Sequence, residues 1–126
     1  MAAPSLLFPA SDVTTIQRDF AAEATLERVR SAAMIARDRI AELDNVRVLG
    51  PEVKSGSDSV RLAIDLRDTG RDAWQVACAM AGRGFTLDAA SHRVIVVRLT
   101  EDDIREATQH RLAAALQIAL WSTAAG

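Results

Sequence analysis

The sequence predicts a two-layer α+β domain, in which a three- to four-stranded, mostly antiparallel sheet carries helices on one face and follows a long linking helix. Three observations predict it. A long helical pattern comes first, two runs with strand periodicity follow it directly, and helical and strand patterns then alternate. At 126 residues, the chain fits a single domain. We expect residues 1–25 to form a lead-in and the start of the linking helix, and residues 26–126 the small α+β domain.

The linking helix is expected from about Asp12 to Asp44, with Ser11 or Asp12 as its N-cap. Its second half carries an apolar stripe at alternating spacings of three and four, which is typical of one buried helix face: Leu26, Val29, Ala33, Ala36, Ile40 and Leu43. The stripe continues less cleanly toward the N-terminus and drifts near Thr25, so the pattern allows a bend or break there. Asn45 is the expected terminator.

The later elements are expected in this order: strand 46–49, strand 60–67, helix 73–83, a short edge strand at 85–87, strand 93–99 and a last helix after residue 100. Gly50 and Pro51 are expected to end the first strand. Asp72 and Thr100 are the expected caps of the two helices. The β-branched run 93–99 is typical of a strand covered on most sides.

The composition excludes several classes of protein. The net charge is −2 and the arginines are spread along the chain, so the basic patch of a nucleic-acid binder is missing. No run approaches the roughly 18 apolar residues of a membrane span, and no signal peptide is evident; we therefore expect a cytoplasmic protein. Cys78 lies in an Ala-rich apolar run and is expected to be buried, while Trp74 and Trp121 are expected to pack against the core.

The familiar motifs of nucleotide binding, nucleophilic catalysis and metalloproteases are missing. One cysteine and two scattered histidines are too few for a zinc site, and His92 and His110 are expected on the surface. We therefore predict no catalytic, cofactor-binding or metal-binding residue. Arg98, inside strand 93–99, is the one candidate for binding a substrate carboxylate. The alternative is a solvent-facing arginine, paired across the sheet with the polar face of strand 60–67 that carries Asp65.

Five segments together resemble one known family in collinear order. Residues 33–51, 57–69, 73–87 and 91–120 are similar to the successive helices and strands of the C-terminal domain of the ornithine/lysine/arginine decarboxylases. These are pyridoxal-phosphate enzymes of the aspartate-aminotransferase fold. Residues 5–11 resemble the segment that precedes the family's linking helix. One departure is the missing Gly-Asp/Thr turn after the last strand, which puts any functional interpretation of that loop in doubt.

The resemblance implies that this chain is not catalytic alone. In the family, the cofactor-binding lysine, its partner residues and the phosphate-binding loop belong to a large N-terminal domain that precedes these segments. Lys54 is the only lysine here, and it aligns with a connector. The resemblance thus implies pyridoxal phosphate in the parent enzyme, none bound by this chain alone, a missing cofactor-binding domain as partner and a homo-oligomer. A free-standing dimerisation or regulatory module and the small domain of a related aminotransferase remain alternatives.

Overall fold

The computed structural model describes residues 10–53 and 58–123, and their side chains from residue 20 onward except that of residue 89. The elements follow one another as α1 Ala10–Ala41, β1 Arg47–Glu52, β2 Val60–Asp65, η2 Arg67–Thr69, α2 Ala73–Ala81, β3 Leu87–Ala90, β4 Val94–Leu99, α3 Glu101–Arg105 and α4 Thr108–Ser122. This order is the predicted one, with the last helix divided in two.

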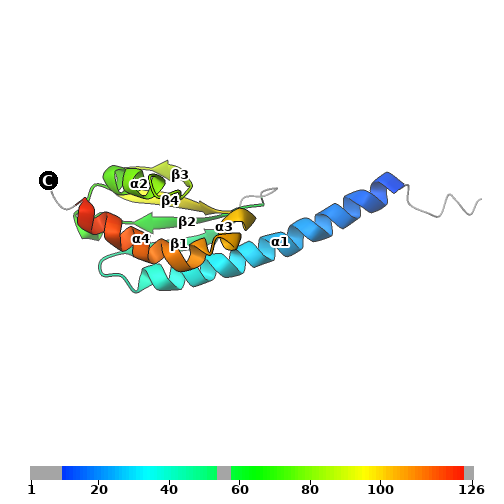
Figure 1. Cartoon of the computed structure of the whole chain (residues 1–126), viewed down its shortest axis with the longest axis horizontal. Coiled ribbons are helices and arrows are strands. Elements are labelled where there is room, and N and C mark those ends of the chain that lie inside the picture. Colours follow the sequence, from blue (N-terminus) through cyan, green and yellow to red (C-terminus); the bar gives the residue numbers. More distant parts are fainter. Residues whose placement is uncertain (1–9, 54–57, 124–126) are drawn as a thin grey trace, which may run out of the picture.

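The four strands form one antiparallel sheet with the order β1-β2-β4-β3. The helices pack on one face of this sheet, and α1 and α4 lie side by side there (Figure 1). The first half of α1 extends beyond the sheet (Figure 1). The predicted α+β class, with helices on one face of an antiparallel sheet, is confirmed.

The core lies between the sheet and the helices. Every second residue of β2 is fully buried because successive strand side chains point to opposite faces. The helices contribute residues at spacings of three and four, among them Val29, Ala33, Ala36 and Ile40 of α1 and Leu112 and Leu116 of α4. Full burial of each Leu, Ile or Val stabilises the fold by about 1.5–3 kcal/mol relative to exposure, and these contacts therefore fix how α1 and α4 sit on the sheet.

The long helix was predicted with the right position and the wrong ends. It begins at Ala10 and runs unbroken past Thr25 to Ala41, so the expected cap residues Ser11 and Asp12 lie inside it. Asn45 has a φ of 62°, the left-handed conformation that Asn tolerates at helix ends. The stripe from Val29 to Ile40 is buried as expected.

Strand β1 does not end at Gly50 as predicted; it continues through Pro51 to Glu52. The pairing with β2 shifts between Leu49 and Glu52. Such a bulge takes residues out of the regular ladder, and β1 is an edge strand, where Pro is tolerated. Strand β3, at the other edge, begins two residues later than predicted.

The two helices of the C-terminal half show capping as predicted. The Asp72 carboxylate accepts a hydrogen bond from the backbone N–H of Trp74 at 3.0 Å. Thr100 is the N-cap of α3, and the carboxylate of Asp103 accepts from its backbone N–H at 2.7 Å. The last helix nevertheless divides at Ala107, whose φ is 58°.

Three expected core residues are exposed instead. Trp74 is 48% and Trp121 68% exposed, and Cys78 is exposed as well. Helix α2 instead buries the stripe that runs through Val76 and Met80, and this stripe leaves Trp74 and Cys78 outside the core. In this Ala-rich helix both stripes are apolar, and the stripe that carries Val76 and Met80 is the one that faces the core.

Candidate functional site

Arg98, the predicted carboxylate-binding candidate, lies on β4 and points away from the helices. Its side chain is 44% exposed, and its Nε lies 3.4 Å from a carboxylate oxygen of Asp88 on the edge strand β3. The expectation that Arg98 faces solvent in a cross-strand ion pair is confirmed, but the predicted partner strand is wrong. Asp65 instead accepts a hydrogen bond from the backbone N–H of Arg67 at 2.9 Å.

The strand register explains the choice of partner. In the β2–β4 ladder Arg98 lies opposite Arg61, while Asp65 lies opposite Val94. Four residues of a strand span about 13 Å, which is too far for an ion pair between Asp65 and Arg98. On the other side of β4, the pairing shifts between Leu87 and Ala89. Asp88 is the extra residue at this irregularity, and its carboxylate reaches Arg98.

Arg61 and Arg98 place two guanidinium groups at paired positions of neighbouring strands. Directly opposite residues in antiparallel strands have Cα atoms about 4.5–5.5 Å apart. Arg61 forms no ion pair within the described residues, and Arg98 is paired with Asp88 alone. Glu52 of β1 is the partner of Arg61 in the β1–β2 pairing, so the two arginines lie in a row with two carboxylates and the row carries no net charge. The arrangement can hold one carboxylate if Asp88 yields its place, and the sequence did not reveal Arg61 or Asp88 because neither register is visible in it.

The surroundings of Arg98 form the uncovered face of the sheet. Val94 and Val96 of β4 are half-buried there and alternate with the buried Ile95 and Val97. Strand β4 is covered on most sides, as predicted for residues 93–99: it lies between β2 and β3, and one of its faces meets the helices. Its other face is only partly covered, and Arg98 is exposed there. Leu49 of β1, opposite Ala63, is 67% exposed on this part of the sheet.

A groove runs along the β3 edge beside this face. It encloses about 430 Å³ and is lined by α2 residues Trp74, Ala77, Cys78 and Ala81 and by β3 residues Leu87, Asp88 and Ala90. Its lining includes Trp74 and Cys78, which were predicted to face the core. The edge strand β3 is short, is irregular at Asp88 and carries a charge there, which are the features by which proteins protect sheet edges from further pairing.

The other predicted positions lie apart from Arg98. His92 and His110 are both exposed, as expected, and His110 lies in the first turn of α4. Lys54 lies outside the described residues. Where side chains are described, no three His, Cys, Asp or Glu side chains gather as a potential metal site. Among the helices of residues 10–53 and 58–123, none has an apolar stretch of the length that a membrane span requires.

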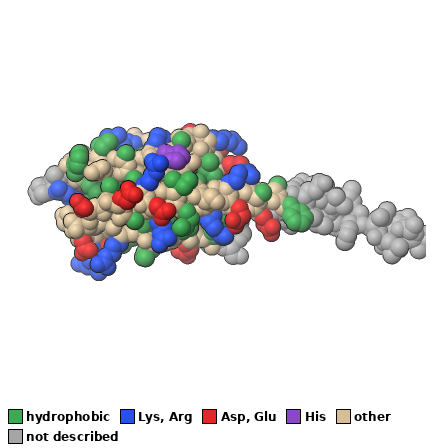
Figure 2. Space-filling view, turned by 90° about the horizontal axis from the view of Figure 1, so that it is seen from below, with side chains coloured by type: hydrophobic (Ala, Val, Ile, Leu, Met, Phe, Trp, Pro, Cys, Tyr) green, Lys and Arg blue, Asp and Glu red, His purple; other side chains and the backbone are tan. Residues whose placement is uncertain are grey.

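Charges of both signs are interspersed on the face drawn in Figure 2, with hydrophobic groups between them. This distribution agrees with the near balance of 15 basic and 17 acidic residues.

No protein-family model matches the chain, and no curated protein matches it.

Proposed function

We propose that this chain is the C-terminal small domain of a pyridoxal-phosphate-dependent decarboxylase of ornithine, lysine or arginine. In the intact enzyme it would help to close the substrate pocket and take part in oligomer contacts, in the cytoplasm. The collinear resemblance described above supports the proposal, and so does the order of elements, a long helix followed by a small sheet-and-helix layer.

One observation carries the proposal: α1 has a large apolar side chain, Phe20, that the described residues leave exposed. Val29 is fully buried against the sheet, whereas Phe20 is 68% exposed. The two residues are nine positions apart, which corresponds to about two and a half helical turns at 3.6 residues per turn. Phe20 therefore lies on the side of α1 opposite to Val29, and residues 20–24 are all exposed. No side chain among the described residues covers Phe20 to any large extent, and in the proposed enzyme the large domain would bury it.

The described residues do not fit pyridoxal phosphate by themselves. The cofactor supplies an electron sink for decarboxylation when it is bound to a lysine amine, and no described residue is a lysine. This chain would therefore support the reaction by positioning and by closing off the site, as expected for a small domain. The aminotransferase alternative requires Arg98 to bind a substrate carboxylate, and Asp88 occupies that guanidinium group at 3.4 Å.

A domain replacement tests the proposal. The chain would replace the C-terminal domain of an ornithine, lysine or arginine decarboxylase, and release of CO₂ from each of the three amino acids would be measured. We expect the truncated enzyme without any C-terminal domain to be inactive and the chimera to regain activity. Phe20→Glu in the chimera should lower that activity by placing a charge in the interdomain contact, while Leu49→Glu, at an equally exposed position on the sheet, serves as the matched control.

The contrary results are specific. A folded chimera that binds pyridoxal phosphate yet releases no more CO₂ than the truncated enzyme would refute the proposed role. The chain on its own should release no CO₂ in the presence of pyridoxal phosphate. A stoichiometric cofactor absorbance on the isolated chain that is lost in Lys54→Ala would also contradict it, because the cofactor amine would then lie in this chain. A tight dimer that Phe20→Glu dissociates, together with an inactive chimera, would favour the free-standing module.

A further inference from the structure

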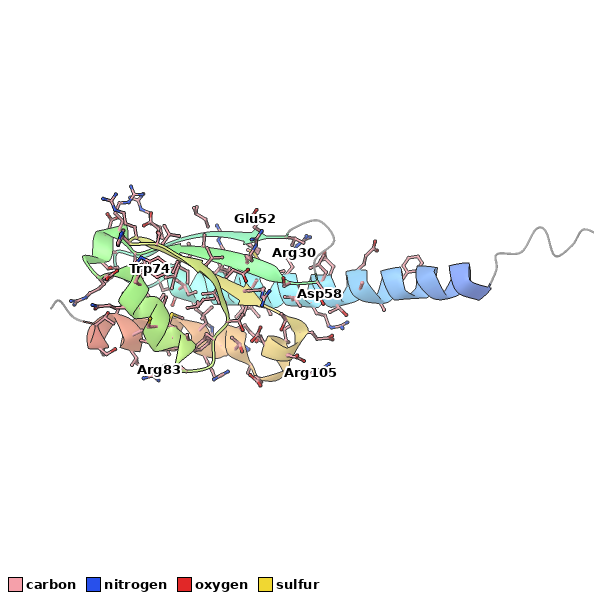
Figure 3. All side chains as sticks on the ribbon, turned by 90° about the horizontal axis from the view of Figure 1, so that it is seen from above. Arg30, Glu52, Asp58, Trp74, Arg83 and Arg105 are labelled. Carbon is pink, nitrogen blue, oxygen red and sulfur yellow. The ribbon has the colours of Figure 1, made fainter. Side chains whose placement is uncertain are left out.

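A second cavity lies on the helix side of the molecule, between the end of α2 and the first half of α4. It encloses about 480 Å³, within the range of small-molecule sites. Its apolar part is formed by Phe85, Ala115 and Ile118, and its basic part by Arg83, His110 and Arg111. Arg83 lies at the α2 end, as Figure 3 shows, and α2 and α4 are in contact. We infer that this cavity binds a small organic anion, a carboxylate or phosphate ester carried on an apolar body.

The charge of the cavity is uncompensated. No Asp or Glu side chain lines it, and neither Arg83 nor Arg111 forms an ion pair with the described part of the chain. Some other arginines of the molecule are paired, among them Arg28 with Glu101 at 2.7 Å and Arg105 with Asp102 at 3.2 Å. Arg83 and Arg111 differ from an isolated unpaired arginine in that they line the same cavity. The first turn of α4 also carries His110 and Arg111 with no acidic residue, although the positive end of a helix dipole favours anions. An anion in the cavity would supply the missing negative charge.

Arg111 is held in place for this role. Its Nε donates to the backbone carbonyl of Glu106 at 3.2 Å and its Nη2 to Thr108 Oγ1 at 3.4 Å. Its guanidinium lies over the ring of Phe85, 5.6 Å from the centroid, and Phe85 is only 7% exposed. These contacts fix the plane of the guanidinium and leave both N–H groups of Nη1 without a described acceptor. A planar arginine with free donors suits carboxylate and phosphate oxygens.

The end of α2 brings Arg83 to the same cavity. The backbone N–H of Gly84 donates to Ala81 O at 3.0 Å and that of Phe85 to Met80 O at 3.3 Å. This is the Schellman pattern of helix termination, which needs a left-handed residue at Gly84, whose φ is 93°. The motif fixes the backbone on both sides of Arg83 and buries Phe85 beneath the cavity. Arg83 and Arg111, from distant parts of the chain, thus line one cavity together with Phe85.

The apolar floor selects an organic anion over an inorganic one. Ile118 is 43% exposed, so a ligand ring or branched chain lying against it would remove apolar surface from water on both sides. Phe85 and Ala115, each 7% exposed, form the base of the cavity. The basic groups provide orientation. This inference does not depend on the proposed function, because it uses only residues of α2, α4 and the turn after α2.

NMR titration of the ¹⁵N-labelled full chain tests the inference with phenyl phosphate, benzoate and the neutral benzyl alcohol. We expect saturable shifts at the amides of residues 84–85 and 111–115 with at least one anion, at a dissociation constant of about 1 mM as suits a ligand of this size. Comparison of phenyl phosphate with benzoate shows whether the cavity prefers a phosphate ester or a carboxylate. Benzyl alcohol should bind at least about tenfold more weakly, because it lacks the charge.

Matched variants make the test selective. Arg83→Gln should weaken binding about fivefold or more, and its side chain has no described partner whose loss would disturb the fold. Arg93→Gln removes the same charge at the opposite end of α2, where the backbone carbonyl of His92 accepts from the N–H of Ala73, and it should leave the affinity unchanged. The inference is overturned if neither anion gives saturable shifts by about 10 mM, or if the two variants weaken binding equally.

Discussion

Gly50 is the position where a single methyl group should do most harm at the sheet edge. Its φ is +112°, a conformation that L side chains rarely adopt. A Cβ at this position would lie 2.9 Å from the backbone oxygen of Arg61 and 3.2 Å from the backbone nitrogen of Glu52. Both atoms belong to the backbone, so no side-chain rotation can relieve the overlap. Gly70 is the natural comparison, because its φ is +71° and a Cβ there would meet nothing within 4 Å.

The two substitutions share one cost and differ in the other. Placing Ala at a positive φ costs about 1 kcal/mol or more at either site. In Gly50→Ala the new Cβ also overlaps with the backbone atoms of Arg61 and Glu52. We take the cost of overpacking a core, about 1–3 kcal/mol, as the measure of this additional loss. We therefore expect a loss in the free energy of unfolding of about 3 kcal/mol for Gly50→Ala and about 1 kcal/mol for Gly70→Ala.

Urea unfolding followed by circular dichroism measures both losses. With a slope of about 1.5 kcal/mol per molar urea, the midpoint should fall by about 2 M for Gly50→Ala and by about 0.7 M for Gly70→Ala. Equal shifts for the two variants would refute the reasoning, because the close approach of the Arg61 carbonyl would then cost nothing. A Gly50→Ala variant as stable as the parent chain would refute the strain as well.

Three further changes can be checked by simple measurements. Leu62→Ala should lower the free energy of unfolding by about 3 kcal/mol, because the Leu62 side chain is fully buried. Leu49→Ala, at a position that is 67% exposed, should change it by less than about 0.5 kcal/mol. A larger loss for Leu49→Ala than for Leu62→Ala would contradict the assignment of the core. Asp72→Ala removes the acceptor of the Trp74 N–H and should cost about 1 kcal/mol, a loss that Asp72→Ser should largely restore in the same urea assay. Cys78 is exposed, so one equivalent of thiol should react with dithionitrobenzoate in the native protein; reaction only after denaturation would show that the thiol is covered.

Much of the fold could be predicted because its signals are local. The alternation of apolar and polar residues in β2 and the three-four spacing from Val29 to Ile40 depend only on nearby positions in the chain. The caps at Asp72 and Thr100 are likewise set within three residues. The prediction failed for α2, where two faces of the same helix are apolar and either could pack against the core. In α2, the stripes through Trp74 and through Val76 are both apolar, and only the shape of the sheet beneath decides which one is buried.

The site was less predictable because it depends on register. Arg98 could be placed on a strand and toward solvent from the alternation of β4, but its partner could not. Which strands are neighbours, and in which register they pair, depends on the three-dimensional fold. The irregularity that brings Asp88 to Arg98 consists of one extra residue in β3. The basic cavity was missed for a related reason. Arg83 and Arg111 are 28 positions apart, and nothing in their local patterns indicates that the end of α2 meets α4.

The two basic clusters differ in what holds their charge, and this difference decides where an anion binds. Arg98 is 3.4 Å from Asp88, so an incoming carboxylate must displace a tethered one and gains only the difference between the two contacts. Exposed ion pairs of this kind contribute only about 0–1 kcal/mol to stability. The Asp88 carboxylate is nevertheless a strong competitor, because it is part of the chain and loses no translational entropy when it pairs with Arg98. Arg83 and Arg111 have no such competing carboxylate among the described residues. Their cavity also contains an aromatic ring, that of Phe85, and the sheet face beside Arg98 has none among the residues named there. The helix side is therefore the stronger anion site, although the sequence directs attention to the strand.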